Sequence, residues 1–203
     1  TLWRDATAGN LAVAMVGYYF GLVMAIGGVM IGPSLGLVED LIDVMIFGPL
    51  AILLMNLARV INDKLILSGF KIRDEIIRDQ NVGTGVVVCA SYIATGLIIY
   101  GALQGELGNV LTAVIFWALG QVALVLGGLV YNWITAYDVH AEIEKDNVAA
   151  GVGFAGALVG LGNVVREGVT GDFISWAVDL QGFAIFVVVG IVLLPIVRVA
   201  TDV

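Results

Sequence analysis

Six long apolar runs constrain this chain more than any other feature of its sequence. A helix rises about 1.5 Å per residue, so about twenty apolar residues cross a hydrocarbon core of about 30 Å. Lipid offers the backbone no hydrogen-bond partner, and the runs lack the alternation of barrel strands, which leaves helices. The fold class that we expect is all-α integral membrane, with six transmembrane helices. They lie near residues 10–31, 41–61, 81–103, 110–133, 147–169 and 176–199.

The composition agrees with a membrane protein and argues against several other classes. Hydrophobic residues make up 60% of the 203 residues and charged residues 13%, against about 25% charged residues in a soluble domain. The net charge of −8 leaves no basic surface for nucleic acid. Because Cys89 is the single cysteine, the chain can form neither an internal disulfide nor a cysteine-based zinc site.

The links between the helices alternate in length and charge. Residues 32–40, 104–109 and 170–175 are short and contain turn formers, whereas 62–80 and 134–146 are longer and charged. Eight of the nine basic residues fall on the side of the longer links, and the positive-inside rule puts that side in the cytoplasm. We therefore expect both termini to be cytoplasmic. The eight are Arg4, Arg59, Lys64, Lys71, Arg73, Arg78, Lys145 and Arg198, with Arg166 alone on the other side.

A similar opening recurs at Asn10, Asn81 and Asn147, each time at the start of a glycine-rich helix. Asparagine is a favoured N-cap residue, so we expect all three to cap their helices. An anion site made by three converging helix N-termini is the alternative.

The three openings also divide the chain into repeats. Each repeat holds two spans, so every copy would enter the membrane from the same side. We expect three parallel two-helix repeats around a rough threefold axis, within a single membrane domain that covers residues 1–203. The repeats are 10–80, 81–146 and 147–203.

Glycines four residues apart are frequent in the first helices, as at Gly17/Gly21 and Gly156/Gly160. Helices in lipid associate through close backbone approach and van der Waals contact, which such pairs allow. We therefore expect the first helix of each repeat to make the tight inner contacts. Contact with a neighbouring subunit is the alternative for some of the pairs.

The run from Glu142 to Gly160, EIEKDNVAAGVGFAGALVG, resembles the signature of the YjfL-like bacterial inner-membrane proteins, whose repeated module is known as domain of unknown function 350. The run from Asp63 to Asn81 resembles the link between successive repeats in that family. The second repeat departs from it, since Gly83-Thr84-Gly85 stands in place of an Ala-Ala pair. The resemblance implies a multi-pass protein of the bacterial inner membrane with cytoplasmic or membrane partners, and it implies no catalytic residue.

Polar side chains near or inside the spans are the candidate functional positions, because hydrocarbon penalises them and they tend to mark pathways. Interhelical hydrogen bonding is the simpler role, and a solute pathway is the alternative. Gln121, at mid-span, needs a partner on another helix, and Arg166 could pair with Asp179. No ionisable residue lies near mid-membrane, which disfavours a proton pump. The candidates are Asn56, Gln121, Asn163, Arg166, Asp179 and Gln181.

The link 62–80 mixes apolar residues such as Ile66 and Phe70 with Lys64, Lys71 and Arg73. Such a segment favours the inner membrane surface, with its apolar side toward lipid. We expect it to be the docking surface for a cytoplasmic partner.

These features favour a non-enzymatic scaffold or accessory subunit of a larger membrane assembly, in contact with lipids and with further copies of itself. A channel or carrier for a small solute or cation, drawn by the acidic outer face, is the alternative. No nucleophile–base set or phosphate-binding loop indicates an enzyme. No histidine lies in a span to ligate haem, and we expect no cofactor and no metal.

Overall fold

The computed structural model describes residues 2–31, 36–66, 72–77, 79–105 and 109–201, which are mainly helical. Six helices in this part of the chain are long and apolar enough to cross a membrane. The six expected spans are therefore confirmed, and the chain is a multi-pass membrane protein. The elements are α1 (Leu2–Met30), α2 (Leu37–Ile61), the π-helix η1 (Asn62–Ile66), α3 (Ile72–Ile77), α4 (Val82–Leu103), α5 (Val110–Ile134), α6 (Val139–Glu144), α7 (Val148–Val169) and α8 (Trp176–Thr201).

The second span differs most from its expected range. It begins at Leu37 and continues through η1 to Ile66, a length of 30 residues. Glu39 and Asp40 lie in the first turn of α2, where acidic side chains favour the positive end of the helix dipole instead of breaking the helix. At about 1.5 Å per residue this span is about 45 Å long, so it must extend beyond the hydrocarbon core.

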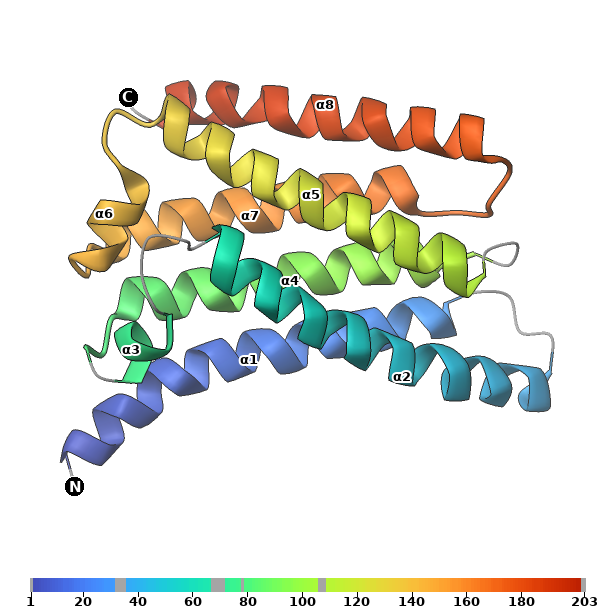
Figure 1. Cartoon of the computed structure of the whole chain (residues 1–203), viewed down its shortest axis with the longest axis horizontal. Coiled ribbons are helices and arrows are strands. Elements are labelled where there is room, and N and C mark those ends of the chain that lie inside the picture. Colours follow the sequence, from blue (N-terminus) through green and yellow to red (C-terminus); the bar gives the residue numbers. More distant parts are fainter. Residues whose placement is uncertain (1, 32–35, 67–71, 78, 106–108, 202–203) are drawn as a thin grey trace.

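The spans form two layers (Figure 1). In one layer α1, α4 and α7 run side by side in the same direction, with α4 in the middle. In the other layer α2 packs on α1 and α4, α5 packs on α4 and α7, and α8 packs on α7 and α5. The first helices therefore make a row, and the ring around a threefold axis that we expected is wrong. The row leaves α4 the most buried span and α8 the least.

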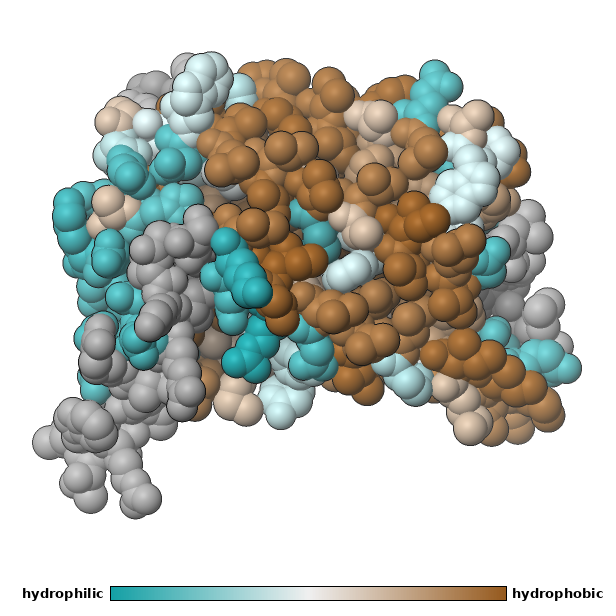
Figure 2. All heavy atoms as spheres, in the orientation of Figure 1, coloured by the Kyte–Doolittle hydropathy of each residue, from teal (hydrophilic) through white to brown (hydrophobic). Residues whose placement is uncertain are grey.

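Both termini, α3 and α6 lie at one end of the bundle (Figure 1), which we call the basic end because Arg59, Lys64, Lys145 and Arg198 lie toward it. Figure 2 shows apolar side chains over the middle of the molecule and hydrophilic ones gathered mainly at its two ends. The exposed Trp133 lies near the basic end, as an interfacial aromatic residue would.

Glycines bring the backbones of α1 and α4 close together. A Cβ atom added to Gly17 would meet the backbone of Cys89, and one added to Gly28 would lie 2.5 Å from the carbonyl oxygen of Tyr100. Between these two points, Gly96 lies directly against the backbone of Gly21. Real Cβ contacts are longer, so a larger residue at these positions would push the two helices apart.

The other side of α4 approaches α7 in the same way. A Cβ atom on Gly151 would lie 2.8 Å from the Cα of Gly83, and one on Gly162 would lie 2.7 Å from the Cβ of Ala94. By contrast, nothing in the described structure lies within 4 Å of a Cβ built on Gly156 or Gly160. That pair of α7 therefore makes no inner contact, and its face points away from the bundle.

We expect Gly21→Ala to destabilise the fold, because the added methyl group would meet the carbonyl oxygen of Tyr92 on α4. The free energy of unfolding should fall by about 1–3 kcal/mol, as in other overpacked sites. Helicity followed through an SDS titration in mixed micelles would measure this change.

Gly27→Ala is the matched control on the same helix, since nothing lies within 4 Å of its added Cβ. It should be neutral or stabilising by up to about 1 kcal/mol through helix propensity. Equal shifts in the two variants would contradict the role given to close backbone approach.

Candidate functional site

Asn81 caps α4 from a buried position at the basic end. Its Oδ1 accepts a hydrogen bond from the Thr84 amide at 2.8 Å. Its Nδ2 donates to the carbonyl oxygen of Ile143 at 2.6 Å and to Oε2 of Glu75 at 3.1 Å. The residue is only 1% exposed, so this single amide joins the start of α4 to α3 and to α6.

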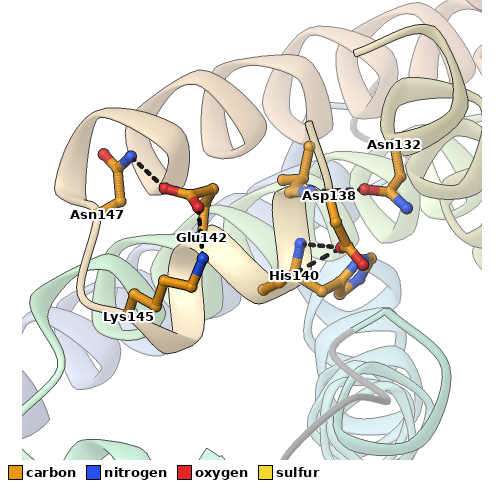
Figure 3. Close-up of polar contacts among 8 residues, drawn as sticks. Asn132, Asp138, His140, Glu142, Lys145 and Asn147 are labelled. Carbon is orange, nitrogen blue, oxygen red and sulfur yellow. Dashed lines mark hydrogen bonds and ion pairs between the residues drawn. The ribbon is translucent and has the colours of Figure 1, made fainter. Parts of the chain in front are cut away.

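Asn147 caps α7 with a related arrangement that is open to solvent. Its Oδ1 accepts from the Ala150 amide at 3.3 Å, and its Nδ2 donates to Oε2 of Glu142 at 2.9 Å. Lys145 Nζ lies 2.9 Å from the other carboxylate oxygen of Glu142 (Figure 3). The hydrogen bonds from Asn147 and Lys145 hold the pKa of Glu142 below its usual range. The contact with Glu142 in turn raises the pKa of Lys145. An asparagine–glutamate pair thus opens both α4 and α7.

The link 134–146 folds into α6 through side-chain caps (Figure 3). Asp138 Oδ1 accepts from the His140 amide at 3.0 Å, and Asn132 Oδ1 accepts from the Val139 amide at 2.7 Å. The His140 ring nitrogen Nε2 lies 2.7 Å from the carbonyl oxygen of Ile66. These contacts give His140 a structural role, because its ring ties α6 to η1. In the described part of the chain, no three His, Cys, Asp or Glu side chains are grouped to hold a metal ion.

Asn10 is not an N-cap, so that expectation was wrong. α1 begins at Leu2 and passes through Asn10 without a break, since alanines and other helix-compatible residues precede it. The Asn10 side chain instead donates to the carbonyl oxygen of Gln80, immediately before α4. With α1 starting earlier and α4 lying between α1 and α7, the three helix N-termini form no shared anion site.

The six polar candidates lie in different surroundings. Gln121 is 2% exposed, and its side chain lies 3.5 Å from Oγ1 of Thr95 on α4, which supplies the partner on another helix that it needs. Asn163 and Gln181 are exposed. Neither forms a hydrogen bond with the described residues. Asn163 lies on the same side of α7 as Gly156 and Gly160.

The expected pairing of Arg166 with Asp179 is wrong. Arg166 pairs with its neighbour Glu167, and its guanidinium lies 5.3 Å from the ring centroid of Tyr100 on α4. Asp179 Oδ2 accepts from the Ser175 amide at 2.7 Å and from the Ile174 amide at 3.1 Å. The backbone amides ahead of α8 therefore bind the Asp179 carboxylate, which we expected Arg166 to bind.

A hollow of about 300 Å³ opens between α1 and α2 toward the basic end, and we call it the α1–α2 hollow. Asn56 Nδ2 donates to Oη of Tyr18 at 3.3 Å and to the carbonyl oxygen of Ile52 at 2.7 Å. The rings of Tyr18 and Tyr92 meet edge to face at 5.5 Å. The lining is Leu11, Ala14, Met15, Tyr18, Tyr19, Asn56, Arg59, Asp63, Ile76, Val88 and Tyr92.

Sequence reasoning had selected only Asn56 from this lining. One signal was available, because Asn56, Arg59 and Asp63 are three and four residues apart and therefore share a helix face. The tyrosines come from α1 and α4, and nothing in the sequence indicates that these helices close the hollow.

The link 62–80 only partly follows its expected placement at the membrane surface. Residues 67–71, including Phe70 and Lys71, lie outside the described residues. Ile66 and Ile76 are 3% and 5% exposed, so these side chains pack into the bundle and do not face lipid. α3 packs against α1 and α4. Docking of a cytoplasmic partner on this link stays a prediction.

We expect Asn81→Ala to be more damaging than Asn147→Ala. The first change removes a cap and the further hydrogen bonds of Nδ2 from a buried site, at a cost of about 2–3 kcal/mol, whereas an exposed cap contributes about 1 kcal/mol. The same SDS titration would measure both variants. Equal losses would mean that the bridge from Asn81 to Ile143 adds nothing to the cap.

The model of the family described as Domain of Unknown Function (DUF350) matches residues 2–103 and 106–203 as two tandem segments. Each segment holds three of the six spans, so the match divides the chain between α4 and α5. The three-repeat division, with boundaries before α4 and before α7, stays a prediction. No curated protein and no solved structure matches the chain. Since the family match covers nearly all 203 residues, the chain belongs to the DUF350 family.

Proposed function

We propose that the protein is a non-enzymatic membrane scaffold or accessory subunit that assembles with a second copy of itself through the outward face of α7. The observation that carries this proposal is an exposed asparagine within a span, beside glycines that no described helix of the chain covers. The face consists of Gly156, Gly160 and Asn163.

The glycines lie along an open groove between α7 and α8. The groove has a volume of about 500 Å³. Leu161 and Leu193 belong to its apolar lining, and Gly190 contributes a small residue from α8. Glycines spaced in this way allow another helix to approach until the two backbones touch. The groove therefore suits a helix of a second chain.

Asn163 supplies the polar contact for such an interface. It lies about 7 Å from the midpoint of α7, by the rise of about 1.5 Å per residue, and thus within the hydrocarbon. An amide there is costly unless it is hydrogen-bonded. Because the amide group both donates and accepts, two copies of Asn163 related by a twofold axis can satisfy each other.

The corresponding face of α4 supports the same interpretation. Aligning the two N-caps, Asn81 and Asn147, relates Gly83 to Ala149 and Ala94 to Gly160. On α4 these positions lie against α7, whereas on α7 both positions are exposed. The face by which α4 packs against α7 thus has a counterpart on α7, and this counterpart is exposed at the end of the row.

The centre of the bundle favours assembly over conduction through a single chain. Ile98 of α4, Leu124 of α5 and Phe154 of α7 are fully buried there. Side chains thus occupy the region where a pore through one chain would run.

The membrane and the orientation belong to the same proposal: three parallel repeats with both termini in the cytoplasm of a bacterium. The described basic side chains at the basic end support this orientation through the positive-inside rule. In a Cys89→Ala background, we expect Lys145→Cys to react with an impermeant thiol reagent only after cells are opened. Asp172→Cys, at the opposite end, should react in intact cells. The reverse pattern would overturn the orientation.

Self-association should depend on the α7 face. In lipid vesicles, single-molecule photobleaching counts subunits while the protein is diluted with lipid. We expect the wild type to dimerise, and we expect Asn163→Leu and Gly156→Leu each to weaken dimerisation by about tenfold, the equivalent of about 1.4 kcal/mol.

Gln181→Leu is the matched control, because it removes another exposed amide that lies outside this face. It should leave dimerisation unchanged. A wild type that stays monomeric at every dilution and co-purifies with no partner would refute the scaffold. Dimers that all three variants leave intact would refute the α7 face alone.

A further inference from the structure

We propose that the α1–α2 hollow binds the headgroup of a zwitterionic phospholipid that carries a primary ammonium group, the phosphoethanolamine type. Arg59 would bind the phosphate and Asp63 the ammonium group. This site is separate from the α7 face and does not depend on the proposed assembly.

The depth of the hollow fits a lipid headgroup. Asn56, Arg59 and Asp63 lie in the last turns of a span that ends at Ile66 and is longer than the hydrocarbon is thick. Charged groups so close to the end of a long span reach the headgroup region. At Asp63 the helix has widened into the π-helix η1, a local form that is frequent at functional sites.

The charges in the hollow are opposite and near one another. Arg59 and Asp63 are four residues apart, and both line the hollow. Among the described residues, neither side chain forms an ion pair or hydrogen bond. An anion and a cation joined by a short ethyl link can therefore meet both groups together, in charge-assisted hydrogen bonds.

The rest of the lining suits a molecule with an acyl chain. Leu11, Met15 and Tyr19 line the hollow and are also exposed, so its wall continues onto the lipid-facing surface of α1. Asn56 and Tyr18 are bonded to each other and add polar atoms beside the charged pair. A soluble zwitterion would leave the apolar part of this lining without a partner, and this favours the lipid.

Binding to delipidated protein in detergent, followed by native mass spectrometry, would test the proposal with three lipids of equal chain length. We expect phosphatidylethanolamine to bind about tenfold more tightly than phosphatidylcholine, whose quaternary ammonium cannot donate to Asp63. We expect a similar margin over phosphatidylglycerol, which has no ammonium group. Soluble phosphoethanolamine should bind far more weakly than the lipid.

Variants separate the two charges. Asp63→Asn should abolish the preference for phosphatidylethanolamine over phosphatidylcholine, whereas Asp63→Glu should keep it. Arg59→Gln should weaken binding of all three lipids. Lys64→Gln, at an exposed neighbour that does not line the hollow, should change nothing. Helicity by circular dichroism would show that each variant is folded.

Several outcomes would overturn the proposal. Equal binding of the three lipids by the wild type would refute the proposed contact between Asp63 and the ammonium group. A preference that Asp63→Asn leaves unchanged would refute it as well. If soluble phosphoethanolamine binds as tightly as the lipid, the ligand of the hollow is a soluble molecule and not a lipid. Loss of binding in Lys64→Gln would mean that surface charge, and not the hollow, recruits the lipid.

Discussion

Close approach of the α4 backbone to both of its neighbours is the constraint on which the rest of the fold depends. Lipid tails are as apolar as leucine side chains, so burying apolar surface gives helices in a membrane little reason to associate. Gly17, Gly28 and Gly96 let α1 touch α4, and Gly151 and Gly162 let α7 touch its other side. Each of these contacts brings many atoms to van der Waals distance and none needs a polar partner. The second layer, α2, α5 and α8, then packs on a row whose spacing is already determined.

The sequence predicted the features that follow from chemistry along one helix. Run length and hydropathy identified all six spans, and the polar side chains Asn81 and Asn147 stand where α4 and α7 begin. Among the features that depend on which helices meet, the tight contacts between the first helices were predicted, but their arrangement was not. The periodic openings suggested a ring, yet a row satisfies the same periodicity. Similarly, Asp179 was expected to find Arg166 across a helix pair, whereas the amides of its own chain segment are nearer.

Asn10 and the α1–α2 hollow show the same limit at the level of single residues. An asparagine before a glycine-rich helix predicts an N-cap. The structure shows that α1 begins ahead of Asn10, whose side chain donates to the carbonyl oxygen of Gln80. The hollow draws its polar atoms from three spans, and spacing within one helix can identify only those on α2. Sequence reasoning predicted the caps at Asn81 and Asn147 and the need of Gln121 for a partner on another helix. It did not identify that partner or the contact that Asn10 makes.

The bond from Asn10 to Gln80 joins residues 70 positions apart, which bears on how the protein is made. At a synthesis rate of about 5–20 residues per second, roughly 4 to 14 s separate the emergence of these two residues from the ribosome. The rest of α1 and all of α2 are synthesised during that interval, so the glycines of α1 have no α4 to pack against until after it ends. The hairpin of α1 and α2 therefore cannot reach its native packing alone, and it does so only after the third span, α4, has been synthesised.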